Sequence, residues 1–473
     1  MQLRRTIIAL VLLALVGATA YLVSKREPVE TAAKLFKIDQ PDITRIDLKY
    51  PDREIEIARD QSGKWQILKP IQTDADQTTA DNLARAIADC ELKKTLQEQP
   101  ADLKPFGLDK PLVVVTITTK SKGVMPSIAV GKNTPVGFSA YIRTSDKPAV
   151  LLTSSAFPPG MQKKVDDLRN RDLMSFKVDD VQKLVLEHDR GPTIEIDRDH
   201  DKWNIVQPAK YAANPTAVHQ ILSTLANSKI ADFISDAPTS VTQYGLGHPH
   251  VTVTVFTGKE NARQSLLFGF KQPEQGKDGI FARRGESSPV YTVHPYVMSD
   301  VNKDLMDLRD KTVLALKPAD VHRIEVAAGA KKFSIERTPA GQWQLAGAAG
   351  GNADLPLVER FLSTIQFLKG SAIAADPMTD PKKFGLDKPA VEIALAGKDG
   401  KDLGTVKLAK MEQEAYEGNK PVSSGRFIYY VSSSQGTPVY TIDDFNFEQL
   451  NKTAADFRSH ATPAATATSR PGS

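Results

Sequence analysis

The sequence predicts an α+β fold built as three tandem copies of a unit of about 140 residues, each an antiparallel sheet region packed with an amphipathic helix and ending in a short helix. The first observation is a repeated phrase, FGLDKP at 106–111 and again at 384–389, with YGLGHP between them at 244–249. The second is the chain's three tryptophans, which stand at nearly equal intervals: Trp65, Trp203 and Trp343. The third is an Asp-Leu/Phe-Arg ending at Arg169, Arg309 and Arg458. Landmarks that keep the same register indicate repetition of a domain.

A chain of 473 residues is longer than one hydrophobic core usually supports, and the repeat divides it into domains. The interval from Arg309 to Arg458 is longer than that from Arg169 to Arg309, and the excess falls in a polar insertion at 411–426. The predicted segments are an N-terminal membrane anchor and linker at 1–35, repeat domains at 36–176, 177–315 and 316–458, and a disordered tail at 459–473.

The N-terminus carries a targeting signal. An uncharged apolar run extends from Thr6 to Val23 between basic pairs, and 18 residues of helix rise about 27 Å, close to the thickness of a bilayer core. We expect a retained single-pass membrane anchor. The alternative is a cleaved signal peptide, because Ala18-Thr19-Ala20 has the small-residue pattern of a cleavage site.

Each unit opens with stretches that alternate apolar and polar residues, such as ITRIDLKY at 43–50, which predicts half-buried strands. Eleven residues after each tryptophan stands a residue that commonly caps a helix: Asp76, Asn214 or Asp354. The following segments place apolar residues at i, i+3, i+4 and i+7, namely Ala80, Leu83, Ala84 and Ile87; Val218, Ile221, Leu222 and Leu225; Val358, Phe361, Leu362 and Ile365. The spacing predicts one amphipathic helix per unit, packed on the sheet.

The repeated FGLDKP phrase is predicted to join the first half of each unit to the second. Its aromatic residue fills the core, its glycine adopts a backbone conformation that a side chain would oppose, and its leucine packs behind them. The proline starts the next strand, whose inward residues alternate: Val113, Val115 and Ile117; Val251, Val253 and Val255; Val391, Ile393 and Leu395. The phrase is therefore interpreted as a structural joint and not as an active site.

Composition narrows the function classes. The net charge is +4, and cations and anions are interspersed and nearly balanced in all three repeats, whereas a nucleic-acid surface needs clustered cations. We therefore predict no nucleic-acid partner. The single cysteine, Cys90, cannot form an internal disulfide, and its position at the edge of the helix's apolar face predicts burial rather than nucleophilic reactivity.

No motif in the chain predicts chemistry. Gly131-Lys132-Asn133-Thr134 falls short of a phosphate-binding loop, and the aligned residues of the other copies suggest a turn at the end of a strand. The pair His248 and His250 lacks further ligands at zinc spacing. The acidic run at 197–203 lacks the glycine of a calcium loop and is interpreted as a solvated turn.

The remaining candidates have structural interpretations. The three tryptophans are predicted to pack in the cores rather than to stack on a ligand. Asp167 and Arg169, with their equivalents, are predicted to pair with backbone or with the next domain, and are interpreted as joints between domains. The sequence thus predicts no catalytic, cofactor-binding or metal-ligating residue, no cofactor, and a protein that is not an enzyme; a small-molecule ligand stays unknown.

The Trp strand, capped helix, F/Y-G-L-x-x-P joint, alternating strand and Asp-Leu-Arg ending, behind an N-terminal anchor, resemble a bacterial family, domain-of-unknown-function family 4340. The resemblance covers roughly residues 36–458 and implies a repeated ectodomain behind one membrane helix. It also implies an association with ABC exporters of the gliding-motility type, which some members have. No catalytic residue is carried over from the family.

Two functions are consistent with these observations. The first is a scaffold or accessory subunit of a membrane complex such as an ABC transporter, anchored by one span in the bacterial inner membrane with the bulk of the chain in the periplasm, or secreted if the signal is cleaved. Its partners would be the membrane and a transporter or other envelope protein. The alternative is a binding module for envelope lipid or glycan, with a groove between sheet and helix.

Overall fold

The computed structural model describes residues 33–458 apart from 136–138, 155–156, 273–277, 286–288, 348–349 and 418–419. The described chain forms two compact units. One comprises the residues up to Asp172 together with Lys229–Phe233, and the other comprises Leu173–Ser228 and the residues from Ile234 onward. The predicted anchor at Thr6–Val23 and the predicted tail at 459–473 lie outside the described residues. Within the described ranges, no helix has the length and apolarity of a membrane span.

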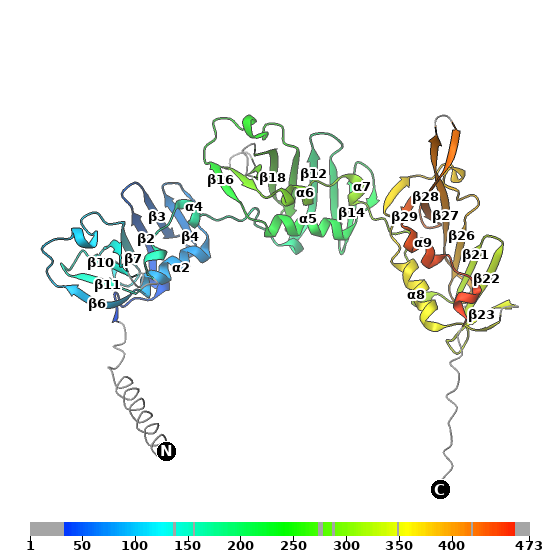
Figure 1. Cartoon of the computed structure of the whole chain (residues 1–473), viewed down its shortest axis with the longest axis horizontal. Helices are drawn as coiled ribbons and strands as arrows, with labels where there is room; N and C mark the ends of the chain where they lie inside the picture. Colours follow the sequence, from blue (N-terminus) through cyan, green and yellow to red (C-terminus); the bar gives the residue numbers. More distant parts are fainter. Residues whose placement is uncertain are drawn as a thin grey trace, which may run out of the picture. The chain divides into compact units, whose positions relative to one another are not determined.

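Three sheets contain all the strands of the described residues, and every strand pair with a described register is antiparallel. The first sheet has the order β1 (Ala33–Lys34), β6 (Glu91–Gln97), β11 (Val150–Thr153), β10 (Ala140–Thr144), β9 (Ile128–Asn133), β7 (Val113–Thr119), β2 (Ile43–Lys49), β3 (Glu54–Arg59), β4 (Trp65–Lys69) and β5 (Thr73–Asp74), with β8 (Gly123–Val124) beside β7. Figure 1 shows β2, β3 and β4 side by side.

The second and third sheets repeat one strand order. The second runs β15 (Tyr211–Ala212), β14 (Lys202–Gln207), β13 (Ile194–Asp199), β12 (Val181–His188), β17 (Val251–Thr257), β18 (Ala262–Lys271), β19 (Ile280–Arg284), β20 (Val290–Val293) and β16 (Asp232–Ser235). The third runs β24 (Gly351–Asn352), β23 (Trp343–Leu345), β22 (Lys331–Arg337), β21 (Arg323–Ala328), β26 (Val391–Ala396), β27 (Asp402–Glu417), β28 (Lys420–Ser433), β29 (Val439–Ile442) and β25 (Ala372–Ala375). The fold is therefore mostly antiparallel sheet with helices, an α+β architecture.

One amphipathic helix accompanies each sheet: α2 (Gln77–Ala88), α5 (Pro215–Asn227) and α8 (Leu355–Gln366). Each predicted cap is confirmed, because the side chains of Asp76, Asn214 and Asp354 accept from backbone N–H groups of the first turn. The apolar residues predicted at i, i+3, i+4 and i+7 are all buried in these helices. Burying that face against the strands supplies most of the stability that a helix this short needs.

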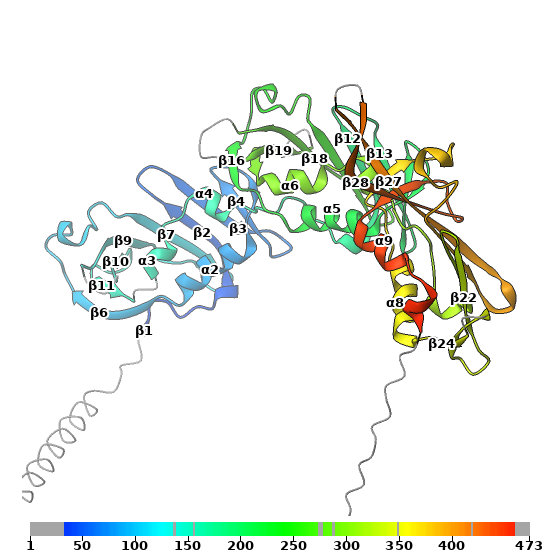
Figure 2. The same ribbon diagram turned by 45° about the vertical axis from the view of Figure 1, so that its right-hand side comes forward.

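Short helices end each repeat and contact the longer helix. They are α3 (Phe157–Gly160) and α4 (Val165–Leu168), then α6 (Pro295–Val301) and α7 (Leu305–Leu308), and finally α9 (Asp444–Leu450) with the 3₁₀ turn η9 (Ala454–Phe457). Further 3₁₀ turns are η1 (Gln40–Asp42), η2 (Lys104–Phe106), η3 (Val178–Asp180), η4 (Thr242–Tyr244), η5 (Pro318–Asp320), η7 (Pro381–Phe384) and η8 (Lys398–Gly400). Contacts of α2 with α3, α5 with α6 and α8 with α9 place a short helix beside the longer helix in every repeat. Figure 2 shows α9 beside α8 in the third repeat.

The aromatic residue of the FGLDKP joint ends a 3₁₀ turn in each repeat, and the glycine that follows it has a positive φ of 68°, 73° or 67° at Gly107, Gly245 and Gly385. The leucine that follows is buried each time, as predicted: Leu108, Leu246 and Leu386. The prediction that the aromatic residue fills the core is correct for Phe384 only, because Phe106 and Tyr244 are half-buried. Each of the three rings instead packs edge-on against another aromatic ring, with centroids 5.0–5.2 Å apart.

The tryptophans do not have identical surroundings. Trp65 and Trp343 are buried, as predicted, but Trp203 is only half-buried, which corrects the prediction of three equivalent core residues. In the first repeat, Asp81 on α2 accepts a hydrogen bond of 2.9 Å from Trp65 Nε1. The aligned residue on α5 is His219 rather than a carboxylate, so the indole of the second repeat lacks that same attachment to its helix.

The insertion at 411–426 lengthens a hairpin instead of adding a loop. β27 and β28 pair with each other from Val406 and Ser433 out to Glu417 and Lys420, whereas the pairing of β27 with β26 reaches only Leu408. Figure 1 shows the two strands continuing together beyond the rest of the third sheet. The insertion therefore forms a two-stranded ribbon that belongs to the third repeat.

Candidate functional site

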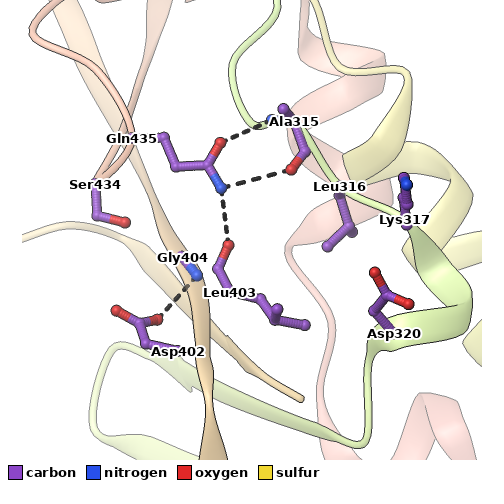
Figure 3. Close-up of a pocket in the computed structure, with 9 residues that line it drawn as sticks. All are labelled: Ala315, Leu316, Lys317, Asp320, Asp402, Leu403, Gly404, Ser434 and Gln435. Carbon is purple, nitrogen blue, oxygen red and sulfur yellow. Dashed lines mark hydrogen bonds between the residues drawn. The ribbon is translucent and has the colours of Figure 1, made fainter.

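A polar pocket of about 460 Å³ lies where the chain enters the third repeat. Three segments form it: the linker Ala315–Lys317 with Asp320, the start of β27 at Asp402–Gly404, and the turn Ser434–Gln435 after β28 (Figure 3). Hydrogen bonds between Gln435 and Ala315 join two of these segments, which lie far apart in the sequence. The pocket thus brings polar groups together that only the tertiary fold makes neighbours.

Gln435 is the central side chain of this pocket. Its Oε1 accepts from the backbone N–H of Ala315 at 3.0 Å, and its Nε2 donates to the carbonyl of Leu403 at 2.9 Å and of Ala315 at 3.5 Å. Figure 3 shows the amide lying between these two stretches of backbone. The side chain therefore uses its hydrogen-bonding capacity to hold the linker against β27.

A glutamine makes the corresponding contacts in the second repeat, but from a strand rather than from a turn. Gln264 on β18 accepts from the N–H of Ser175 at 3.1 Å and donates to the carbonyl of Ser175 at 2.7 Å. Ser175 and Ala315 are equivalent positions of the two linkers in the repeat alignment. In both repeats a glutamine amide thus attaches the linker backbone to the sheet, although the two glutamines stand at different positions of the repeat. This indicates a positioning role for the amide rather than a reactive one.

The two carboxylates that line the pocket, Asp320 and Asp402, do not form a reactive pair. Asp402 Oδ1 accepts from the N–H of Gly404 at 2.9 Å, which fixes the start of β27. Figure 3 shows Asp320 on the other side of the Leu403 side chain from Asp402. General acid–base chemistry needs two groups directed at one reacting atom. This arrangement orders a linker, and it does not place acid and base around a common point.

A second cavity of about 650 Å³ adjoins this linker and contains a buried ion pair. The Arg309 guanidinium lies 3.7 Å from the centre of the Tyr211 ring, and its Nη2 pairs with Asp376. The two side chains are 6% and 11% exposed. Burial opposes ionisation of Asp376, but hydrogen bonds from Thr437 and Arg309 hold the pKa of this carboxyl below its usual range.

Arg169 makes a related contact in the first compact unit. Its guanidinium lies 3.5 Å from the centre of the Phe233 ring, and it pairs with Asp166 at 3.3 Å. Arg169 and Arg309 thus both contact residues of the sequence repeat that follows them, as predicted, whereas Arg458 at the end of the third repeat is exposed. Asp167 pairs with backbone, the other predicted alternative: its carboxylate caps the short helix α4 by accepting from the N–H of Lys164.

The other candidates of the sequence lie apart from these cavities. Cys90 is buried, and burial raises the pKa of its thiol to about 12, as expected of an unreactive side chain. His250 faces Asp189, with 3.3 Å between Nδ1 and Oδ2. Across the described part of the chain, no three His, Cys, Asp or Glu side chains gather as metal ligands would.

Two of the predicted turns require correction. Gly131 and Gly269 lie inside β9 and β18, and Ala409 lies within the long β27, so this position is not a turn at the end of a strand. A Cβ atom at Gly269 would come within 2.0 Å of the Tyr244 carbonyl, so the glycine lets the joint approach the strand. In the acidic run, Asp197 and Asp199 belong to β13, and Asp197 pairs with Lys183, so only His200 and Asp201 form the turn before β14.

Sequence reasoning missed three arginines that cover the tryptophans. Arg59, Arg198 and Arg337 are the cross-strand neighbours of Trp65, Trp203 and Trp343, at 4.2, 5.7 and 5.0 Å from the ring centres. Their even spacing was visible in the sequence, but only the strand register shows that each arginine stands opposite a tryptophan.

Comparison with known proteins gives one family. The model of a family described as "Domain of unknown function (DUF4340)" matches residues 65–205, 203–389 and 343–462, so each match begins at one of the three tryptophans. No curated protein matches the chain. Among solved structures, a crystal structure of a DNA polymerase sliding clamp from Pseudomonas aeruginosa with ligand is 8% identical over 87% of this chain and 94% of that chain, with a TM-score of 0.12. A score that low carries no argument about fold or function.

Proposed function

The chain belongs to the DUF4340 family, and from this membership we propose that it is a membrane-anchored, envelope-facing scaffold or accessory subunit of a membrane complex. In this proposal each family match corresponds to one copy of the repeated unit, with an antiparallel sheet, a capped amphipathic helix and a short terminal helix. The N-terminal segment holds the chain in the bacterial inner membrane, and the three repeats extend into the periplasm.

The observation that carries the proposal is the buried contact of Arg309 with Tyr211 and Asp376. A buried ion pair contributes little net stability, because removing both charges from water costs about as much as their attraction returns. Such a pair does fix geometry, since the guanidinium must face both the ring and the carboxylate. A scaffold needs repeats that hold a fixed relation, and this contact between the second and third sequence repeats supplies one.

The linker contacts support the same role. Glutamine side chains tie the residues between repeats to a sheet at Ser175 and at Ala315. In this proposal the polar pocket of Figure 3 is the place where hydrogen bonds hold the linker against the third sheet. We infer that the protein acts by presenting surfaces to a partner and not by turnover of a substrate. The partner class that we propose is a transporter or another envelope protein.

Co-purification tests the proposal. The full chain, expressed at its natural level and extracted in a mild detergent, is expected to bring down an integral membrane complex. The matched control is the chain with Arg309→Gln and Asp376→Asn, in which the repeats lose their fixed relation and recovery of the complex falls. Recovery of the unaltered chain as a monomer under several extraction conditions would count against the proposal.

Localisation is tested separately. Protease added to spheroplasts is expected to digest the three repeats. Without protease, the intact chain is expected in the membrane fraction. A shortened chain that begins after Ala20 in the soluble periplasmic fraction would support the alternative of a cleaved signal and would remove the anchor from the proposal.

A further inference from the structure

A cavity of about 260 Å³ opens between α8 and the terminal helices of the third repeat. Its apolar wall consists of Leu357, Phe361 and Phe457. The two phenylalanine rings meet edge to face, with centroids 5.2 Å apart, and both residues are buried. Arg360 on α8, which is exposed, and Lys452, which is half-buried, line the cavity with their cationic side chains. Asp456 also lines the cavity, and its carboxylate interacts electrostatically with Lys452. The cavity therefore joins an aromatic wall to two positive charges and one negative charge.

The same place is closed in the second repeat by hydrogen bonds between helices. Asp300 on α6 accepts from Thr224 Oγ1 at 2.8 Å and from Gln220 Nε2 at 3.1 Å, and both donors lie on α5. Thr224 is buried and lies against α6 through this bond. The carboxylate thus fills the space between the two helices and ties them together.

The first repeat closes this place by close packing. Gly160 at the end of α3 stands at the position of Asp300 in the repeat alignment, and Ala86 on α2 stands at the position of Thr224. A Cβ atom at Gly160 would lie 3.3 Å from the Ala86 Cβ, so the helices approach until small residues touch. Small residues in the first repeat and a hydrogen-bonded carboxylate in the second therefore bring the two helices into contact at this place.

The third repeat has residues that do not bridge the helices. Arg360, Thr364 and Gln449 occupy the positions of Gln220, Thr224 and Asp300. Thr364 Oγ1 donates to the carbonyl of Arg360 at 3.0 Å within its own helix instead of reaching α9. An amide has replaced the carboxylate that accepted both bonds, and a long cation has replaced the glutamine. The space between α8 and α9 stays open because the third repeat lacks the hydrogen bonds that join α5 to α6 in the second repeat.

We propose that this cavity is a binding site for a small amphipathic anion, a carboxylate with a short apolar chain. The chain lies on Leu357, Phe361 and Phe457, and the carboxylate is bound by Arg360 and Lys452 through charge-assisted hydrogen bonds. The remaining charged side chain at the cavity, Asp456, is engaged at its Oδ2 by the N–H and hydroxyl of Thr453, both at 2.7 Å. The volume suits a ligand smaller than a typical drug molecule.

The site does not depend on the scaffold proposal, because it lies within the third repeat and would bind its ligand whether or not a membrane partner is present. The test uses octanoate as probe and the full chain in lipid nanodiscs, with the heat measured on empty nanodiscs subtracted. Isothermal titration is expected to show saturable binding at one site per chain. Octanol and octylammonium are expected to give only the non-saturable partition seen with empty nanodiscs.

Three variants locate the site. The double change Arg360→Gln with Gln449→Asp rebuilds the closing interaction of the second repeat around Thr364 and is expected to abolish saturable binding. Lys452→Gln is expected to weaken binding about tenfold, since a hydrogen bond to a charged group is lost. Lys398→Gln removes an exposed charge elsewhere in the third repeat and is expected to leave binding unchanged.

The proposal is overturned if octanoate shows no saturable binding, if octanol binds as tightly as octanoate, or if both the closing variant and Lys452→Gln retain the affinity of the unaltered chain. Should the closing variant fail to fold, as judged by circular dichroism, Lys452→Gln alone decides, because its side chain lies at the edge of the helical layer. A tenfold loss supports the site, and unchanged affinity rejects it.

Discussion

At the scale of single residues, the repeated glycines show how one backbone requirement produces a sequence signature. Gly245 has a φ of 73°, and a Cβ atom there would lie 2.8 Å from the backbone nitrogen of Phe270. Both facts exclude a side chain, the first by backbone conformation and the second by space. The FGLDKP phrase recurs because its glycine adopts a positive φ in every repeat, at Gly107, Gly245 and Gly385, and the sequence was sufficient to infer this backbone conformation.

Gly245→Ala is expected to lower the free energy of unfolding by about 2 kcal/mol or more, because a left-handed backbone and a steric clash act together. Gly258→Ala is the matched control: its φ is 67°, but a Cβ atom there meets nothing within 4 Å. Only the backbone cost of about 1 kcal/mol remains for the control. Denaturant unfolding measures both, and equal losses would show that the space beside Phe270 is not limiting.

Asp81 illustrates a residue whose role needs the tertiary structure. One oxygen, Oδ1, accepts from Gln40 Nε2, Arg59 Nη2 and Trp65 Nε1 at 2.7, 2.7 and 2.9 Å. Burial opposes the charge, but the bonds from Trp65 and Arg59 hold the pKa of Asp81 below its usual range. Helix α2, the strands β3 and β4 and the turn η1 therefore meet at one carboxylate in the first repeat.

Asp81→Ala is expected to destabilise the first repeat by about 1–2 kcal/mol, a value reduced because the carboxylate is partly exposed. Since the folded pKa is depressed, this contribution is present above about pH 4, the unfolded value, and is lost as pH falls through the folded pKa. Glu359→Gln, at the aligned position of α8, is the control. Unfolding followed from pH 7 to pH 2 is expected to show the difference between Asp81→Ala and the unaltered chain disappear; a constant difference would contradict it.

At the scale of elements, the N-caps and the buried faces of the three amphipathic helices could be predicted from the sequence. Their caps and apolar positions follow local rules, because an N-cap interacts with its own first turn and an apolar stripe follows the helical period. The ribbon of β27 and β28 was not predicted as strands. Its polar residues carry no alternating pattern, and a two-stranded ribbon takes its pairing from the hairpin that it extends.

Asp354→Ala is expected to lower the free energy of unfolding by about 1 kcal/mol, because the first turn of α8 loses the acceptor for the Leu357 N–H. Ser363→Ala, at an exposed position in the middle of the same helix, is expected to change stability by less than about 0.5 kcal/mol. Thermal unfolding measures both. An effect of Ser363→Ala as large as that of Asp354→Ala would show that the cap is unimportant.

At the scale of the whole molecule, contacts between successive sequence repeats decide whether the repeats unfold independently or together. Arg309 contacts Tyr211 of its own repeat and Asp376 of the next. Removing one partner of a buried pair leaves the other charge without compensation. The second and third repeats are therefore expected to unfold together as long as the pair is intact.

Asp376→Asn is expected to destabilise the contact by about 3 kcal/mol and to split one calorimetric transition of the second and third repeats into two. Because the folded pKa of Asp376 is depressed, acid has the same effect: the contribution is present above about pH 4 and is lost as pH falls through the lower folded value. Thr437→Val removes only one hydrogen bond to the carboxylate and is expected to cost about 1 kcal/mol. A single unchanged transition in Asp376→Asn would show that the repeats are not coupled through this pair.

The sequence by itself determined the three-fold repetition, the α+β class, the helices with their caps, the buried leucines and the burial of Cys90, because each of these depends on local periodicity or on register between copies. Only the tertiary structure decided where Gln435 binds, that Arg59 covers Trp65, that Trp203 is half-buried, and that the space between α8 and α9 is open. These features depend on pairs of residues far apart in the chain, whose distance is set by strand register and helix packing, and no periodicity in the sequence encodes such distances.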